Sequence, residues 1–166
     1  MLKAGRRPKE GVKHIPDIFV WHRETIVERV RVEIIRATYY SYAVGTDQQF
    51  QEWSNQIKTN AYDFVGAQGQ YVGGGFLYPR LFKKLNREAK RKGVDISIAV
   101  DALTHTHHDS IDVAYLISGD GDYKPLIEEI IRSGKQVYLG ALSEGLNPHL
   151  PNLVDKFFNL DTVYFE

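Results

Sequence analysis

The side chains best suited to chemistry in this chain lie in a short acidic loop, residues 118–123, which reads Ser-Gly-Asp-Gly-Asp-Tyr. An apolar run at 113–117 with the length and composition of a buried strand precedes it, and apolar residues at helical spacing follow it. The acidic loop is therefore expected at the carboxyl end of a strand, where open α/β sheets bind their ligands. There, the carboxylates of Asp120 and Asp122 and the hydroxyl of Ser118 can converge on one hard cation such as Mg²⁺ or Mn²⁺.

Two other interpretations of the acidic loop stay open on spacing alone. A turn rich in Asp and Gly is common at strand ends and needs no ligand. A calcium loop uses the same residue types, but the EF-hand pattern fails because no Glu occupies its closing position.

A further carboxylate, Asp101, lies upstream in an apolar stretch. Residues 94–100 alternate as in a strand, but their apolar positions also fit one face of a helix; we favour a helix with Asp95 as its N-cap after Gly93. Asp101 would then lie about one and a half turns into that helix, among apolar neighbours. Burying a carboxylate costs several kcal/mol unless something pairs with it, and a metal shared with the acidic loop would do so.

The stretch that contains these carboxylates resembles the NYN domains of the PIN-like nuclease superfamily, and most closely the bacterial LabA-like (DUF88) group. The resemblance is carried by Lys92-Gly93-Val94-Asp95, by Asp101, and by the acidic loop after its hydrophobic strand. Tyr123 stands where Phe is commoner in the family. The likeness spans residues 30–160 and is most specific between 92 and 137.

This resemblance implies an α/β fold, a Rossmann-like three-layer α/β/α sandwich with a mainly parallel sheet. It also implies a metal-dependent ribonuclease that hydrolyses RNA phosphodiester bonds through a carboxylate-bound Mg²⁺ or Mn²⁺ centre. Carried over residue by residue, Asp101, Asp120 and Asp122 are expected to hold the metal, and Ser118 to orient a ligand or contact phosphate.

One departure from the family puts catalysis, though not the fold, in question. Members open with an apolar strand ending in Asp-Gly-x-Asn, whose Asp is a metal ligand, and the first 45 residues here contain no such motif. Either the chain begins late, or residues 17–22 form a degenerate first strand with Trp21 where that Asp should be. The alternative function is a catalytically weakened domain that acts as a regulatory or interaction module for RNA or protein. A Rossmann-like phosphatase with an Asp nucleophile is disfavoured, because no Asp-x-Asp motif follows an opening strand.

Composition sets the broad class. At 166 residues the chain suits one domain, with residues 1–14 polar and expected to be flexible. Its formal net charge is zero, so no global basic field points to nucleic acid. The sequence has no cysteine and no run approaching the ~18 apolar residues of a membrane span, which fits a cytoplasmic protein without establishing it.

Basic residues nevertheless crowd the segment before the acidic loop. A helix opened by Pro79 would present them, either as a solvated face or as contacts to an RNA backbone. The candidates for substrate binding are Lys84, Arg87, Arg91 and Lys92, together with Ser143, which should follow a strand at the same sheet edge as the acidic loop.

Two further sequence features are less specific, a group of histidines and a group of aromatic residues. His105, His107 and His108 could form a zinc cluster but fit solvated positions at a helix end better. The aromatic residues at 39–42 could belong to a core or to an interface, and base rates favour a core. A homodimer stays an open alternative.

The pattern of elements alternates between strand and helix, which favours a parallel sheet. In the first half we expect a helix at 17–29, a strand at 32–42, a helix at 46–59, a strand at 61–65, a flexible connection at 66–75 and then the basic helix. In the second half we expect a helix from Asp95, a strand at 113–117, a helix at 122–133 ended by Gly134, a strand at 136–140, a helix at 149–158 and a strand at 162–165.

Overall fold

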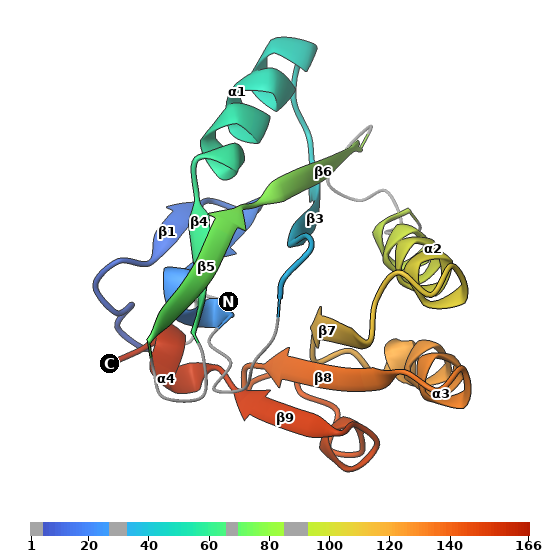
Figure 1. Ribbon diagram of the computed structural model, residues 1–166. Coiled ribbons are helices and arrows are strands. Elements are labelled where there is room, and N and C mark those ends of the chain that lie inside the picture. Colours follow the sequence, from blue (N-terminus) through green and yellow to red (C-terminus); the bar gives the residue numbers. More distant parts are fainter. Residues whose placement is uncertain (1–4, 27–32, 66–69, 85–92) are drawn as a thin grey trace. The chain divides into compact units, whose positions relative to one another are not determined.

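A computed structural model describes residues 5–26, 33–65, 70–84 and 93–166 (Figure 1). The chain divides into two compact units, unit 1 from Met1 to Val94 and unit 2 from Asp95 to Glu166. Both units mix helices with strands, and both contain parallel strand pairs. The α/β class and the parallel pairing are as the sequence predicts, while the three-layer sandwich stays a prediction.

The described part of unit 1 contains three two-stranded sheets and the helix α1. Its elements are β1 (Lys13–Ile15), β2 (Phe19–Trp21), the 3-10 helix η1 (Arg23–Thr25), β3 (Thr38–Ala43), α1 (Asp47–Lys58), β4 (Ala61–Val65), β5 (Tyr71–Phe76) and β6 (Tyr78–Lys83). Strands β1 and β2 pair antiparallel, as do β4 and β5, whereas β3 and β6 pair parallel.

Helix α1 shows how directly local sequence can set an element. Thr46 is its N-cap: the hydroxyl accepts the amide N–H of Gln49, and the Gln49 side chain accepts the amide N–H of Thr46 in return. The apolar face ends in Ile57, whose side chain is fully buried. The helix predicted at 46–59 is confirmed, and so is the following strand β4.

Unit 2 contains a three-stranded parallel sheet in the order β7–β8–β9. Its elements are α2 (Val94–His107, which begins at the boundary of unit 1), β7 (Val113–Ile117), η2 (Gly121–Tyr123), α3 (Lys124–Arg132), β8 (Gln136–Ala141), η3 (Leu150–Asn152), β9 (Lys156–Asn159) and α4 (Asp161–Tyr164). Helix α3 joins β7 to β8, which makes the β–α–β crossover that parallel strands require. Gly134 ends the crossover helix with a φ of +81°, a conformation that favours glycine.

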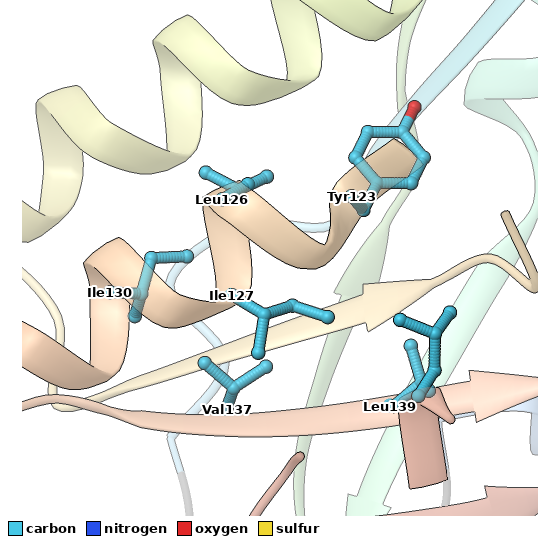
Figure 2. Packing of buried hydrophobic residues seen from close by; sticks show 7 residues of the cluster. Tyr123, Leu126, Ile127, Ile130, Val137 and Leu139 are labelled. Atoms are coloured by element: carbon cyan, nitrogen blue, oxygen red, sulfur yellow. The ribbon is translucent and has the colours of Figure 1, made fainter. Parts of the chain in front are cut away.

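The core of unit 2 lies between α3 and β8, as Figure 2 shows. Ile127 of α3 points toward Val137 and Leu139 of β8. Ile130 belongs to the same cluster, and all four side chains are at most 2% exposed. Fully burying one such side chain stabilises the fold by about 1.5–3 kcal/mol. Helix α2 adds a second apolar layer to this cluster through Ile98, Ala99, Ala102 and Leu103.

The helix predicted at 17–29 is wrong where the structure describes it, because Phe19–Trp21 is strand β2. Phe19 and Trp21 are both buried, and a two-residue alternation is the period of a strand. The Trp21 indole N–H donates to the carbonyl of Ala61 over 3.0 Å, and the Phe19 ring packs edge-on against Tyr39 at 4.8 Å. These contacts are with residues of β4 and β3 that are distant in sequence, so the local spacing of apolar residues does not reveal them.

Two further predictions in unit 1 are wrong. Residues 71–75 belong to strand β5 rather than to the flexible connection predicted at 66–75, and Pro79 lies within strand β6 rather than opening a helix. Residues 66–69 of that connection and residues 85–92 of the predicted basic helix lie outside the described residues. Pro79 is tolerated because β6 is the edge of a two-stranded sheet, where one side of the strand needs no amide donor. The strand predicted at 32–42 is confirmed only from Thr38 onward.

The last two elements of unit 2 also differ from prediction. Instead of a helix at 149–158, the structure has the short turn η3 and strand β9, and instead of a strand at 162–165 it has the short helix α4. Asp155 explains the first difference: its carboxylate accepts the amide N–H of Val137, and its own amide donates to the Val137 carbonyl. These two hydrogen bonds align the start of β9 with β8. The pairing joins residues distant in sequence, so it cannot be predicted from the local spacing of apolar residues.

Candidate functional site at the acidic loop

The acidic loop leaves the carboxyl end of β7 and leads through η2 into α3. Because β8 runs parallel to β7, the segment that follows β8 starts from the same sheet edge. The two segments are bonded to each other: the amide N–H of Asn147 donates to the carbonyl of Gly119 over 2.9 Å. The acidic loop therefore lies where its sequence context predicts.

Both glycines of the acidic loop are required by the close approach of this neighbouring segment. A Cβ atom on Gly119 would lie 2.9 Å from the carbonyl oxygen of Gly145, and one on Gly121 would lie 2.2 Å from the amide nitrogen of the Asn147 side chain. The first contact is with backbone and the second with the end of a side chain. Glycine at both positions thus allows the two segments to pack closely at the sheet edge.

Within the loop, the candidate ligands also hold the backbone in place. Oδ1 of Asp120 accepts the amide N–H of Asp122 over 2.9 Å, so Asp120 is the N-cap of η2. The Ser118 hydroxyl accepts the amide N–H of Asp120 over 3.2 Å. Both aspartates are exposed to solvent. The loop therefore presents two carboxylates, one residue apart, on a backbone that these same side chains stabilise.

Tyr123 connects the acidic loop to α2. Its side chain is 6% exposed, and its hydroxyl donates to Oδ1 of Asp95 over 2.9 Å. In Figure 2 the Tyr123 ring stands at the start of α3, with its hydroxyl directed away from the sheet. Asp95 is thus a carboxylate of α2 that contacts the loop, and it lies in the first helical turn rather than at the predicted N-cap.

Helical geometry explains why Asp95 holds this position. Asp95, Ala99 and Ala102 are spaced i, i+4 and i+7, which places them on one face, and both alanines pack on the core. Sequence reasoning gave Asp95 only a capping role. The spacing of Asp95 from these core alanines is the signal that could have identified it.

Asp101 is half-buried and lies six residues beyond Asp95, which turns it about 120° away around the helix axis. Among the described residues, no three His, Asp or Glu side chains lie close enough to share a metal ion. The donor chemistry of the acidic loop suits a hard cation, since Asp120 and Asp122 are exposed oxygen ligands. The described carboxylates supply this pair but do not assemble the predicted set of three.

Ser143 lies in the segment after β8, as expected, and its position is fixed by the end of β9. Its hydroxyl accepts the side-chain N–H of Asn159 over 3.0 Å, and its amide donates to Oδ1 of Asp161 over 3.0 Å. The residue is exposed. A contact between Ser143 and substrate stays a prediction.

Of the basic residues predicted to contact substrate, the structure describes Lys84. Lys84 follows β6 in unit 1, half-buried, with its ammonium 4.8 Å from the centre of the Tyr42 ring. Arg87, Arg91 and Lys92 lie outside the described residues. The acidic loop belongs to unit 2.

The histidines at the end of α2 have polar contacts. Nδ1 of His105 lies 3.0 Å from the Ser110 hydroxyl, and His107 lies 4.0 Å from Glu129. A stronger interaction nearby ties Lys135, before β8, to Asp109. This hydrogen bond lowers the pKa of Asp109 and raises that of Lys135.

Fold and site together define a class: an α/β protein with parallel strands and carboxylates at their carboxyl edge. Residues 19–161, which extend through both units, match the NYN domain family, and the chain belongs to this family. NYN domains are PIN-like domains of the nuclease type, which suggests ribonuclease activity.

The fold is also similar to a solved protein of unknown function from Vibrio parahaemolyticus, with a TM-score of 0.52. The two chains are 19% identical over 81% of this chain and 74% of the other, a likeness that concerns fold alone. A comparison with curated proteins gave no match. None of the described helices has the length and apolar character to cross a membrane.

Proposed function

We propose that this chain is a ribonuclease-type domain that hydrolyses RNA phosphodiester bonds at the acidic loop, and that it acts in the cytoplasm as a LabA-like member of its family. The observation that carries the proposal is the exposed pair Asp120 and Asp122 at the carboxyl edge of a parallel sheet. Membership of a nuclease-type family supports the choice of RNA phosphodiester as substrate.

In this proposal each loop residue has a distinct task. Oδ1 of Asp120 holds the Asp122 amide, so Oδ2 is the oxygen we assign to a cation, together with the Asp122 carboxylate. Ser118 keeps Asp120 in position through the Asp120 amide. A bound Mg²⁺ or Mn²⁺ would activate water and neutralise charge on the reacting phosphate. Asp101 is retained as a candidate third ligand, and Asp95 as the residue that anchors the loop through Tyr123.

The test is Mn²⁺ titration calorimetry combined with cleavage of a labelled single-stranded RNA. We expect Asp120→Asn to abolish both Mn²⁺ binding and cleavage while leaving the fold intact, because Asn keeps the oxygen that caps η2. The matched control is Asp112→Asn, which removes an exposed carboxylate just before β7, at the opposite end of that strand. A fully active Asp120→Asn variant would refute the assignment.

The second candidate function is a catalytically silent module that binds RNA or protein. It is favoured by one observation, that the described carboxylates do not form a three-ligand cluster. It predicts no Mn²⁺ binding and no cleavage by the parent chain, so the same titration separates the two functions.

A further inference from the structure

A groove in unit 1 lies between α1 and β6, far along the sequence from the acidic loop. Its volume is about 610 Å³, and the described residues that line it come from these two elements. The lining residues used below are Asp47, Phe50, Asn55 and Lys58 from α1, and Arg80, Phe82 and Lys83 from β6.

The charge of this groove is positive, in contrast to the zero net charge of the chain. Lys58, Arg80 and Lys83 line it, against the single carboxylate of Asp47. The Asp47 carboxylate lies 2.6 Å from the Lys83 ammonium, and this contact lowers the pKa of Asp47. Both side chains of the pair are more than half exposed, so solvent screens their attraction and the lysine can exchange partners at little cost.

Aromatic rings alternate with these cations. The Lys83 ammonium lies 6.0 Å from the centre of the Phe50 ring, and the Arg80 guanidinium lies 5.9 Å from that of Phe82. The Phe50 ring is also tilted against Trp53 at 5.5 Å, which holds it in place. Phe50 and Phe82 thus line the groove beside these cations, together with the amide of Asn55 as a hydrogen-bonding group.

We infer that this groove binds single-stranded RNA, with bases stacked on the aromatic rings and phosphates on the cations. Stacking platforms beside a basic track are how proteins hold single strands without reading their sequence. An acidic peptide would pair with the charges but would leave the aromatic rings without a stacking partner. The bases of a duplex are stacked on one another and are not available to the rings. The choice of RNA rests on the proposed function, whereas binding in the groove does not depend on cleavage.

The test measures fluorescence anisotropy of a labelled oligouridine about 12 nucleotides long, in EDTA so that no metal-dependent cleavage occurs. Lys58→Gln should weaken binding and reduce the slope of log affinity against log salt by about 0.7, the share of one phosphate contact. Lys13→Gln, at an exposed lysine of β1 outside the groove, is the matched control and should change neither quantity. Phe50→Leu keeps apolar volume but removes the ring, and should weaken binding at least about fivefold.

One variant should strengthen binding, a result that misfolding cannot produce. Asp47→Asn removes the carboxylate from the groove and releases Lys83 to a phosphate, so affinity should rise about two- to fivefold. Glu52→Gln removes the same charge from α1 at a residue that does not line the groove, and should have a smaller effect. Duplex RNA of the same length should bind more weakly than the single strand.

These outcomes separate the inference from the proposed function. Binding that responds to the groove variants, in a chain that never cleaves RNA with Mn²⁺, would support the groove and overturn the nuclease. Cleavage by the parent with no change in affinity in Lys58→Gln, Phe50→Leu and Asp47→Asn would overturn the groove alone. Failure of the parent to bind oligouridine, or equal binding of the duplex, would also overturn the groove.

Discussion

Replacing Tyr123 by phenylalanine removes one hydroxyl from the link between the acidic loop and α2 and leaves the ring in the core. That hydroxyl donates to the carboxylate of Asp95 over 2.9 Å. A hydrogen bond to a charged group is worth about 1.5–3 kcal/mol, but Asp95 is an exposed residue and water can replace the hydroxyl, so we expect a loss near 1 kcal/mol.

The pair energy is best measured by a double-mutant cycle of Tyr123→Phe and Asp95→Ala. Both tryptophans, Trp21 and Trp53, lie in unit 1, so the probe is chosen within unit 2, which contains Tyr123. Amide hydrogen exchange in α3 reports the opening free energy of unit 2 directly. We expect a coupling energy of about 1 kcal/mol between the two sites.

The matched control is Tyr138→Phe, which removes a tyrosine hydroxyl that donates to the neutral side chain of Gln136 over 3.2 Å. This substitution should be additive with Asp95→Ala. If the Tyr123–Asp95 cycle is also additive within about 0.3 kcal/mol, the hydroxyl does not anchor the loop and the reasoning is refuted.

Three further predictions concern unit 2. Gly119→Ala should lower the melting temperature more than Gly121→Ala does. The added Cβ clashes with the backbone of Gly145 in the first variant and with the movable side chain of Asn147 in the second. The further substitution Asn147→Ala should therefore rescue Gly121→Ala but not Gly119→Ala. Leu139→Ala, in the fully buried centre of unit 2, should cost about 2–5 kcal/mol in hydrogen-exchange opening energy, and a loss under 1 kcal/mol would contradict the packing. The lowered pKa of Asp109 and the raised pKa of Lys135 make their pairing stabilising between the ordinary values of 3.8 and 10.5. The difference in melting temperature between parent and Lys135→Gln should therefore be constant near neutral pH. It should shrink as pH falls through the folded-state pKa of Asp109 or rises through that of Lys135, and a difference that shrinks at neither extreme of pH would rule this out.

The sequence predicts those elements of this fold whose causes are local. Helix α1 is an example, because Thr46 and Gln49 form a capping box that can be read directly from the residues. The acidic loop is another, since an apolar run and an amphipathic helix flank it. Strand β9 could not be predicted in this way, because it depends on the bonds of Asp155 to Val137 on another strand.

The candidate site shows the same division. The positions of Asp120 and Asp122 follow from their neighbours in sequence, whereas the choice between Asp95 and Asp101 as the loop's contact on α2 depends on which face of α2 meets the core. The alternation of residues 94–100 fits both a strand and a helix, so the sequence left that face undetermined. In the structure, Ala99 and Ala102 pack on the core and turn Asp95 toward Tyr123.

Electrostatics gives a reason for binding and chemistry to lie on different elements. The exposed carboxylates of the acidic loop repel phosphate, and a chain of zero net charge offers no general attraction to RNA. Cations must therefore be gathered locally, as they are in the groove between α1 and β6, where three basic side chains face one carboxylate. Affinity for a single strand should then be set by Lys58 and Arg80, and turnover by Asp120. On this reasoning Asp120→Asn should bind oligouridine in EDTA at least as tightly as the parent, because it removes a negative charge without touching the groove.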